Sequence, residues 1–179
     1  SLVEDITLSI IPYVESKNIN IVFDTYIEEL KIRCDPESME RVILNLLSNA
    51  IKFTDNNGNI SVFIEADEKY VFIRVKDDGI GISEDIREEI FNRFVQEDKS
   101  FNRKKEGSGI GLALVKSLVE LHDGEVYLEK VSKGSEFVVK LPNIKIDEEL
   151  DVYNKVMDAE SKPLVQKIHI EFSDIYELY

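Results

Sequence analysis

The 179-residue chain contains little of several residue types, and each shortage excludes a class of protein. Its one cysteine, Cys34, cannot form an internal disulfide, so nothing indicates an oxidising compartment, and we interpret it as a buried thiol rather than a nucleophile. No apolar run reaches the roughly 20 residues of a membrane span. The chain starts without the basic cluster of a signal peptide and without methionine, which we interpret as the start of an excised fragment.

Positive charge is also scarce. The chain has 22 Lys and Arg residues against 36 Asp and Glu residues, which gives a net charge of −14. Such a surface repels nucleic acids and anionic membranes, so neither is expected as a partner. An anionic ligand would therefore need positive charge that is gathered locally. The hydrophobic share of 43% and the charged share of 32% are typical of a soluble globular protein with a sizeable core.

The spacing of apolar residues predicts helices and strands in grouped order, which indicates an α+β fold. We expect a two-layer α/β sandwich, with a mixed, mainly antiparallel sheet and helices packed on one face. Helices are predicted over 2–17 with a kink at Pro12, from Pro36 to about residue 54, over 84–94 and over 110–122. Strands are predicted over 20–25 and 31–34, and hairpins over 60–67 with 70–78 and over 125–131 with 135–142.

The predicted elements divide the chain into one domain and a different final segment. Residues 1–142 form the domain, and residues 1–17 are alternatively the end of an upstream helical linker. The part from residue 143 to 162 is acidic and has few core residues. LVQKIHIEF, residues 164–172, alternates between apolar and polar positions, which predicts an extra edge strand. A flexible tail is the alternative for residues 143–179.

A polar stripe lies along the helix that follows Asp35, a good N-cap residue. Asn45, Asn49 and Lys52 follow one another at spacings of four and three, so they should be neighbours on the side opposite to a broad apolar face. One interpretation is a solvated face, although such faces usually carry better helix formers than Asn. The other is a binding site, since an Asn carbonyl can ligate Mg²⁺ and a Lys can meet phosphates.

Two glycine motifs follow the stripe in sequence. Asp77-Asp78-Gly79-Ile80-Gly81 comes directly after a predicted strand, where glycines allow a tight turn and a close approach of the backbone. Residues 107–112, GSGIGL, open a predicted helix, and the free N–H groups of a helix start can bind an anion. No strand precedes this second motif, so it does not fit a Rossmann dinucleotide site. Either motif alone is weak evidence for a site.

The three motifs together are more specific than any one of them. N-x-x-x-N-x-x-K, then D-x-G-x-G, then G-x-G-x-G, in this order, resembles the ATP-binding domain of sensor histidine kinases, which belong with DNA gyrase and the mismatch-repair ATPases. IFNRF, residues 90–94, is similar to the Phe-containing box of that family, and residues 134–142 are similar to its closing strand. The resemblance covers roughly residues 1–142. It implies a Bergerat-type ATP-binding fold with ATP and Mg²⁺ as cofactors.

The resemblance implies a role for each residue of the stripe and of the first glycine motif. Asn49 would give its amide oxygen to Mg²⁺, Asn45 would lie beside the phosphates, and Lys52 would contact them. Phe53 would lie against the adenine or the ribose. Asp77 would accept a hydrogen bond from the exocyclic amine of adenine, which agrees with its chemistry, because a carboxylate only accepts and guanine offers an acceptor at that position.

The remaining residues of the implied site lie in later segments. Gly79 and Gly81 would let the loop approach the base, and Ser135 would help to fix the contact of Asp77 with adenine through a water. Residues 95–108 would form a lid over the phosphates, in which Arg103 would contact the γ-phosphate. Other cations of the lid are Lys99, Lys104 and Lys105, and the further nucleotide-binding residues are Ile82, Phe94, Gly107, Gly109, Gly111 and Leu112. Phe91 and Phe94 would anchor the base of the lid or simply belong to the core.

Position 45 distinguishes a kinase from a hydrolase. Hydrolases of this superfamily have a water-activating Glu one turn before the metal-binding Asn, whereas Asn45 cannot take a proton at neutral pH. Phosphoryl transfer needs positioning and charge neutralisation more than a base on this domain, so transfer is favoured, with Asn45, Lys52 and Arg103 as the catalytic set. The alternatives are a related ATPase and a catalytically silent nucleotide-binding interaction module.

The expected phosphate acceptor is a His on a helix, followed by an acidic residue. His122 and His169 are the two histidines of the chain, and neither has that setting. We therefore expect the acceptor on a separate helical dimerisation domain of the same protein, upstream of residue 1. The resemblance implies a homodimeric parent with a response regulator as its downstream partner. It also implies that this domain is cytoplasmic, and it leaves open whether the parent is anchored in a membrane.

Overall fold

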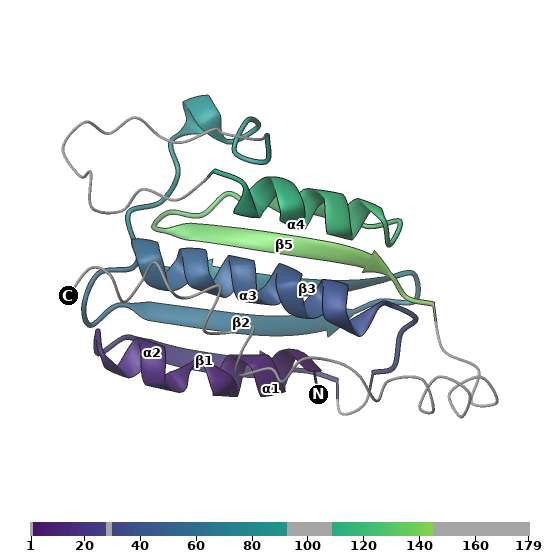
Figure 1. The fold of residues 1–179 in the computed structure, drawn as a ribbon, viewed down its shortest axis with the longest axis horizontal. Helices are drawn as coiled ribbons and strands as arrows, with labels where there is room; N and C mark the ends of the chain where they lie inside the picture. Colours follow the sequence, from purple (N-terminus) through teal and green to yellow (C-terminus); the bar gives the residue numbers. More distant parts are fainter. Residues whose placement is uncertain (1, 28–29, 93–108, 145–179) are drawn as a thin grey trace.

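Four helices, five strands and one 3₁₀ turn make up the part of the chain that the computed structural model describes, residues 2–27, 30–92 and 109–144 (Figure 1). The helices are α1 (Leu2–Ser9), α2 (Ile11–Glu15), α3 (Pro36–Phe53) and α4 (Gly111–Glu120), and the 3₁₀ turn is η1 (Glu84–Ile86). The strands are β1 (Asn20–Thr25), β2 (Asn59–Ala66), β3 (Tyr70–Asp77), β4 (Glu125–Leu128) and β5 (Ser135–Pro142).

The strands form one sheet in the order β1-β2-β3-β5-β4. β1 pairs with β2 in parallel, and the other three pairs are antiparallel. Figure 1 shows the helices lying over one face of this sheet. The predicted fold class, a mixed and mainly antiparallel sheet with helices on one side, is therefore confirmed.

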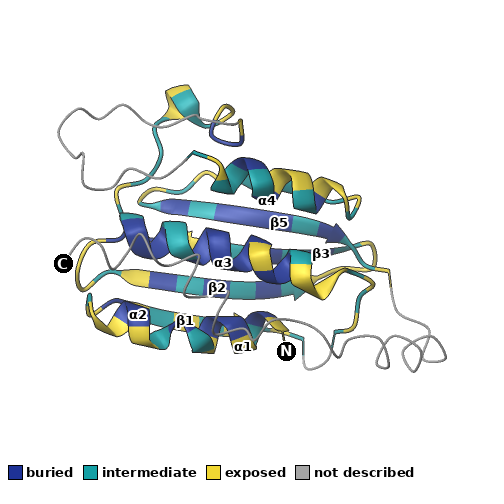
Figure 2. Ribbon diagram, in the orientation of Figure 1, coloured by how far each residue is buried: buried dark blue, intermediate teal, exposed yellow. Residues whose placement is uncertain are grey.

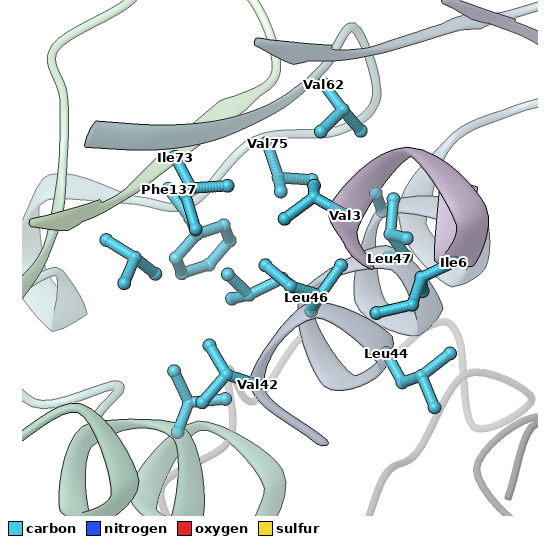
Figure 3. Packing of buried hydrophobic residues seen from close by; sticks show 14 of the residues in the cluster. Val3, Ile6, Val42, Leu44, Leu46, Leu47, Val62, Ile73, Val75 and Phe137 are labelled. Carbon is cyan, nitrogen blue, oxygen red and sulfur yellow. The ribbon is translucent and has the colours of Figure 1, made fainter. Parts of the chain in front are cut away.

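The core lies between the sheet and α3. Along β2 and β3 buried residues recur at every second position, as expected for strands with one covered face, and β5 adds the buried Val138 to the same alternation (Figure 2). Figure 3 shows the side chains of this face, among them Val62, Val75 and Phe137, directed toward Leu46 of α3. Burial of apolar area at about 25 cal/mol per Å² is the main stabilising contribution of such a layer.

The first two helices belong to the same packed unit. Pro12 stands at the beginning of α2, and the helical run is interrupted at residue 10, as the sequence predicts. α1 packs against α3, and the core includes Val3, Ile6 and Tyr13 from α1 and α2. None of the helices in the described ranges is long and apolar enough to cross a membrane.

Two predicted elements are wrong. Over residues 31–34 only Ile32 forms an isolated bridge, and the N–H of Arg33 donates to the carbonyl of Ile144 at 2.8 Å. This segment is too short for a strand because Asp35 already caps α3. In place of the helix over 84–94 the structure has η1 followed by turns, since the buried Phe91 packs edge-on against Phe137, with ring centroids 6.2 Å apart.

Other predictions hold or lie beyond the described residues. The hairpin β2–β3 and the helix α4 are as expected, and the strand predicted over 125–131 ends at Leu128. Residues 93–94, which complete the predicted helix over 84–94, and the predicted edge strand over 164–172 lie outside the described residues.

Candidate functional site

Asp77 is a buried carboxylate at the end of β3, with an exposed fraction of 4%. Its Oδ1 accepts a hydrogen bond from the N–H of Gly79 at 2.9 Å. Ser135 stands opposite Asp77 in the β3–β5 ladder. Burial raises the pKa of Asp77, and the hydrogen bond from Gly79 and the polar groups of Ser135 only partly oppose this effect. Ser135 therefore lies next to Asp77, and its predicted contact through a water stays a prediction.

Glycines allow the loop after β3 to lie against two other segments. A Cβ atom on Gly79 would stand 2.2 Å from the carbonyl oxygen of Phe53, the last residue of α3. The same oxygen accepts a hydrogen bond from the N–H of Ile80 at 3.3 Å. On the other side, a Cβ atom on Gly134 would stand 1.9 Å from the carbonyl oxygen of Asp77. The backbone of these three segments thus fixes the position of the Asp77 carboxylate.

The polar stripe of α3 does not lie on an outer face of the helix, and the interpretation as a solvated face is wrong. Asn45 and Lys52 are both buried, with exposed fractions of 7%, and Asn49 is half-buried. α4 packs on this side of α3, so that a Cβ atom on Gly111 would stand 2.5 Å from Oδ1 of Asn45. Asn45 therefore lies at the junction between α3 and the start of α4, and the side chains of Asn45 and Lys52 are not on an open surface.

The side chains of the stripe are placed differently from one another. Asn45 donates through Nδ2 to the carbonyl of Arg41 at 3.0 Å, which leaves its oxygen directed at the start of α4. Nζ of Lys52 lies 5.9 Å from the ring centroid of Phe53. The amide of Asn49 makes no hydrogen bond within the part of the chain that the structure describes. Of the three, Asn49 is thus the side chain that is open to a ligand.

The start of α4 brings part of the second glycine motif to the stripe. Gly109 has a φ of +66°, and α4 begins at Gly111 beside Asn45. The first N–H groups of such a helix have no partner within the helix and attract negative charge. Leu112 and Ile82 are half-buried and pack against the core. Phe94 and the predicted lid over residues 95–108 lie outside the described part, and the lid contains Lys99, Arg103, Lys104, Lys105 and Gly107.

The donor set fits a hard cation only together with an anionic ligand. Among the described residues no group of three or more His, Cys, Asp or Glu side chains is arranged to hold a metal ion. An amide oxygen such as that of Asn49 is a suitable Mg²⁺ ligand, and Mg²⁺ in proteins commonly takes most of its other ligands from phosphates and water. The site therefore suits a metal that arrives with a polyphosphate.

Asp78 is a structural residue of this region that the sequence analysis missed. Its carboxylate accepts from the N–H of Asn59 at 2.7 Å and from the amide of Asn59 at 3.0 Å, and Lys133 lies at 3.4 Å. These hydrogen bonds lower the pKa of Asp78, which is the opposite of the effect on Asp77. The signal available in the sequence was the Asp-Asp pair, in which one carboxylate faces inward and the next faces outward at a strand end.

His122 makes two hydrogen bonds inside the domain. Its Nδ1 lies 2.7 Å from the carbonyl oxygen of Leu118, and its Nε2 accepts from the N–H of Asp35 at 3.0 Å. The ring thereby joins the end of α4 to the start of α3. Cys34 is half-buried, and desolvation raises the pKa of its thiol, which agrees with an unreactive side chain.

Comparison with known proteins identifies the class to which this fold and site belong. Residues 34–145 match the family described as histidine kinase-, DNA gyrase B-, and HSP90-like ATPase. Histidine kinase P4 from Formosa agariphila is 37% identical over 146 residues, which are 78% of this chain and 10% of that protein. The catalytic domain of the histidine kinase ThkA superposes with a TM-score of 0.72 at 26% identity, covering 80% of this chain and 92% of that one.

The chain belongs to the histidine kinase-, DNA gyrase B-, and HSP90-like ATPase family. Within this family it is a catalytic domain of the histidine kinase type, and ATP is its nucleotide. It spans about a tenth of the length of the P4 kinase. A larger ThkA structure, solved in complex with the response regulator protein TrrA, has a TM-score of 0.68 at 26% identity, covering 79% of this chain and 39% of that one.

Proposed function

We propose that this domain transfers the γ-phosphoryl group of Mg-ATP to a His side chain on a separate helical dimerisation domain of its parent protein. In this reaction a phosphorus–nitrogen bond forms at the imidazole, the bond from the γ-phosphorus to the bridging oxygen breaks, and ADP leaves. The observation that carries the proposal is the buried amide of Asn45 at the start of α4. An amide there can hold a phosphate but cannot deprotonate water, so the residues favour transfer over hydrolysis.

Each residue of the site has a role in holding the nucleotide. The carboxylate of Asp77 accepts a hydrogen bond from the exocyclic amine of adenine, Gly79 holds this carboxylate in place, and Ser135 helps to fix the contact with adenine through a water. Phe53, at the end of α3, lies against the adenine or the ribose. The loop of Gly79 and Gly81 gives the base access to Asp77.

The phosphates lie along the polar stripe. Lys52 contacts them, Asn45 lies beside them at the start of α4, and Asn49 gives its amide oxygen to Mg²⁺. Bound Mg²⁺ supplies charge neutralisation for the leaving phosphate. Gly109 and Gly111 allow the backbone to approach the phosphates, and the cation that reaches the γ-phosphate is Arg103. Lys105 and Gly107, in the glycine-rich segment that precedes α4 in the sequence, are the remaining residues that we assign to nucleotide binding.

The partners follow from the same reaction. The acceptor is a His on a helical dimerisation domain, the parent is a homodimer, and a response regulator receives the phosphoryl group next. The ThkA–TrrA complex supports this last step, because a related kinase is seen there with such a protein. The two hydrogen bonds that His122 makes inside the domain, with Leu118 and Asp35, support an acceptor outside this domain.

Radiolabelled γ-phosphate tests the proposal. The domain alone is expected to bind ATP, to hydrolyse it very slowly and to remain unlabelled. Label should appear on the helical His-bearing region of the same parent when this region is added as a second chain, at a low rate because the tether is absent. Label should disappear with Asn49→Ala, even when the acceptor chain is in excess.

Three outcomes would contradict the proposal. Rapid release of phosphate without any acceptor chain would favour an ATPase. Nucleotide binding without transfer to the acceptor, and without any dependence on the γ-phosphate, would favour a silent interaction module. Label on the domain itself would mean that one of its own residues is an acceptor.

A further inference from the structure

Lys17, which follows α2 in the sequence, contacts the C-terminal end of α3, the helix that carries the polar stripe. Its Nζ donates a hydrogen bond to the carbonyl oxygen of Ile51 at 2.8 Å. Ile51 stands in the last turn of α3, where carbonyl groups lack a partner further along the helix. A cation at this end of a helix also interacts favourably with the helix dipole. Lys17 therefore gives the Ile51 carbonyl a hydrogen-bond donor and holds in place the last turn of α3, which carries Lys52 and Phe53.

Two backbone hydrogen bonds surround this contact. The N–H of Asn57 donates to the carbonyl of Lys17 at 3.1 Å, and the N–H of Asn20 donates to the carbonyl of Gly58 at 2.9 Å. Asn57 has a positive φ of 63°, so the loop after α3 has a specific and unusual backbone conformation at this point. We call these three hydrogen bonds the Lys17 clamp. The clamp joins the α2–β1 connection to the loop between α3 and β2.

The segments that the clamp joins also contact the loop after β3, which carries Asp77 and Gly79. Asn59, which follows Gly58 of the clamp, donates to the carboxylate of Asp78 through its N–H and its amide. The carbonyl of Phe53, two residues after Ile51, accepts the N–H of Ile80. The turn that Lys17 holds is thus also the surface against which Gly79 packs. A shift of this turn would move Lys52, Phe53 and the Asp77 loop together.

We propose that Lys17 is a positioning residue for the nucleotide, which fixes the last turn of α3 so that Lys52 and the Asp77 loop meet ATP together. This inference rests on the proposed function. Lys17 is half-buried and stands outside the apolar core, so its removal is expected to leave the fold intact. Its effect should appear in the affinity of the folded domain and not only in its stability.

Calorimetric titration of Lys17→Met with Mg-ATP and with Mg-ADP tests this. Both affinities are expected to fall by about three- to tenfold, because a displaced turn affects groups that the two nucleotides share. Lys17→Arg, which keeps a cationic donor, should restore most of the affinity. Lys17→Gln, which keeps a donor without the charge, serves as a second variant if Lys17→Met fails to fold.

Ile6→Val is the matched control for stability. Ile6 is fully buried in α1, so the variant destabilises the domain without touching the clamp. All variants are compared at a temperature where the unfolded fraction of each is below about 1%, since an unfolded fraction of this size cannot change an apparent Kd measurably. The control is expected to melt earlier and to bind with unchanged affinity.

The outcomes separate the inference from the function on which it rests. Unchanged affinity of Lys17→Met, with ATP bound normally by the unmodified chain, overturns the role of Lys17 alone. An equal loss of affinity in Ile6→Val would mean that Lys17 acts only through stability, and this result also overturns the proposed positioning role of Lys17. Failure of the unmodified chain to bind ATP overturns the proposed function, and the inference with it.

Discussion

At the proposed base end of the site, the carboxylate of Asp77 is held by a backbone group, whereas at the proposed phosphate end the side-chain amide of Asn45 lies against the start of another helix. Gly79 and Gly134 approach carbonyl groups so closely that no Cβ atom fits. At the phosphate end, the close neighbour of Gly111 is the movable amide oxygen of Asn45. The shape of the base end is therefore set by close contacts between backbone segments, whereas the shape of the phosphate end is set by side chains.

This difference predicts how the two ends respond to substitution. A change at the base end disturbs the end of β3, the loop that follows it and the end of α3 together, so stability and ATP binding should fall together. A change at the phosphate end removes one functional group from a helix that the core already holds, so binding should fall while the fold remains. The following variants test this contrast, beginning with the largest expected effect.

Gly79→Ala should unfold or strongly destabilise the domain, because its Cβ atom would stand 2.2 Å from a backbone oxygen that cannot move away. We expect the free energy of unfolding to fall by roughly 2–4 kcal/mol and ATP binding to be lost. Gly111→Ala is the matched variant at the phosphate end, and it should destabilise less, since the amide of Asn45 can turn aside. Urea denaturation measures both, and equal losses in the two variants would remove the contrast.

Asn49→Ala should weaken Mg-ATP binding by about 1–3 kcal/mol, because a ligand oxygen for the metal is lost. The far-UV circular dichroism should stay the same, since the half-buried amide makes no hydrogen bond within the described residues. Titration with ATP in the presence of a chelator is the control, and there the variant and the unmodified chain should bind alike. A difference that persists without Mg²⁺ would show that Asn49 acts on something other than the metal.

Asp77→Asn should weaken ATP binding by about tenfold, in the range for a lost hydrogen bond to a charged group, and should reduce the preference for ATP over GTP. ATP affinity of the unmodified chain should also fall as the pH falls through the raised pKa of Asp77, because adenine needs the ionised carboxylate. The variant should lack that part of the pH dependence. Equal binding of ATP and GTP by the unmodified chain would mean that Asp77 does not read the base.

The raised pKa also has a consequence for stability, and its sign differs from the usual carboxylate case. Between the ordinary Asp pKa of about 3.9 and the raised pKa of Asp77, the folded chain binds more protons than the unfolded chain. The contribution of Asp77 to the free energy of unfolding therefore decreases as the pH rises through this window. Denaturation of Asp77→Asn at several pH values should show this part of the slope removed.

Asp35→Ala should have the smallest effect and should separate the site from the rest of α3. Asp35 caps the helix by accepting the N–H of Ser38 at 3.0 Å, so we expect a loss of about 1 kcal/mol of stability. Hydrogen bonding to Ser38 lowers the pKa of Asp35, so this stabilisation is present above the ordinary Asp pKa and is lost as the pH falls through the lowered one. ATP affinity should not change, and a large loss of affinity would show that both ends of α3 control the site.

Local signals in the sequence were sufficient for much of the fold. Asp35 followed by Pro36 fixed the start of α3, alternation fixed the hairpin β2–β3, and the break near Pro12 was placed correctly. The predicted strand over 31–34 failed, because four residues beside a helix cap cannot extend a sheet. The predicted helix over 84–94 failed because Phe91 is drawn into the core, which no local pattern records.

For the site, the sequence indicated residue types but not their surroundings. The spacing placed Asn45, Asn49 and Lys52 on one side of α3, yet it also suggested an outer face, because the packing of α4 on that side depends on the tertiary structure. The contact of Lys17 with Ile51 spans 34 residues and could not be seen in any window of the sequence. Close approach of glycines was predicted at Gly79, and its backbone partner, the carbonyl of Phe53, was not.

β1 and β2 run in the same direction, and this has a kinetic meaning. No tight turn can join two parallel strands, so the chain must pass through the whole of α3 before they pair. The hairpins β2–β3 and β4–β5, in contrast, close between neighbours in sequence. Closing the longer loop costs more conformational entropy and is therefore slower, so we expect β1 to pair with β2 late during refolding. Lys17, which leads into β1, would then reach Ile51 only at this late step, and the capacity to bind ATP would be among the last properties that a refolding chain regains.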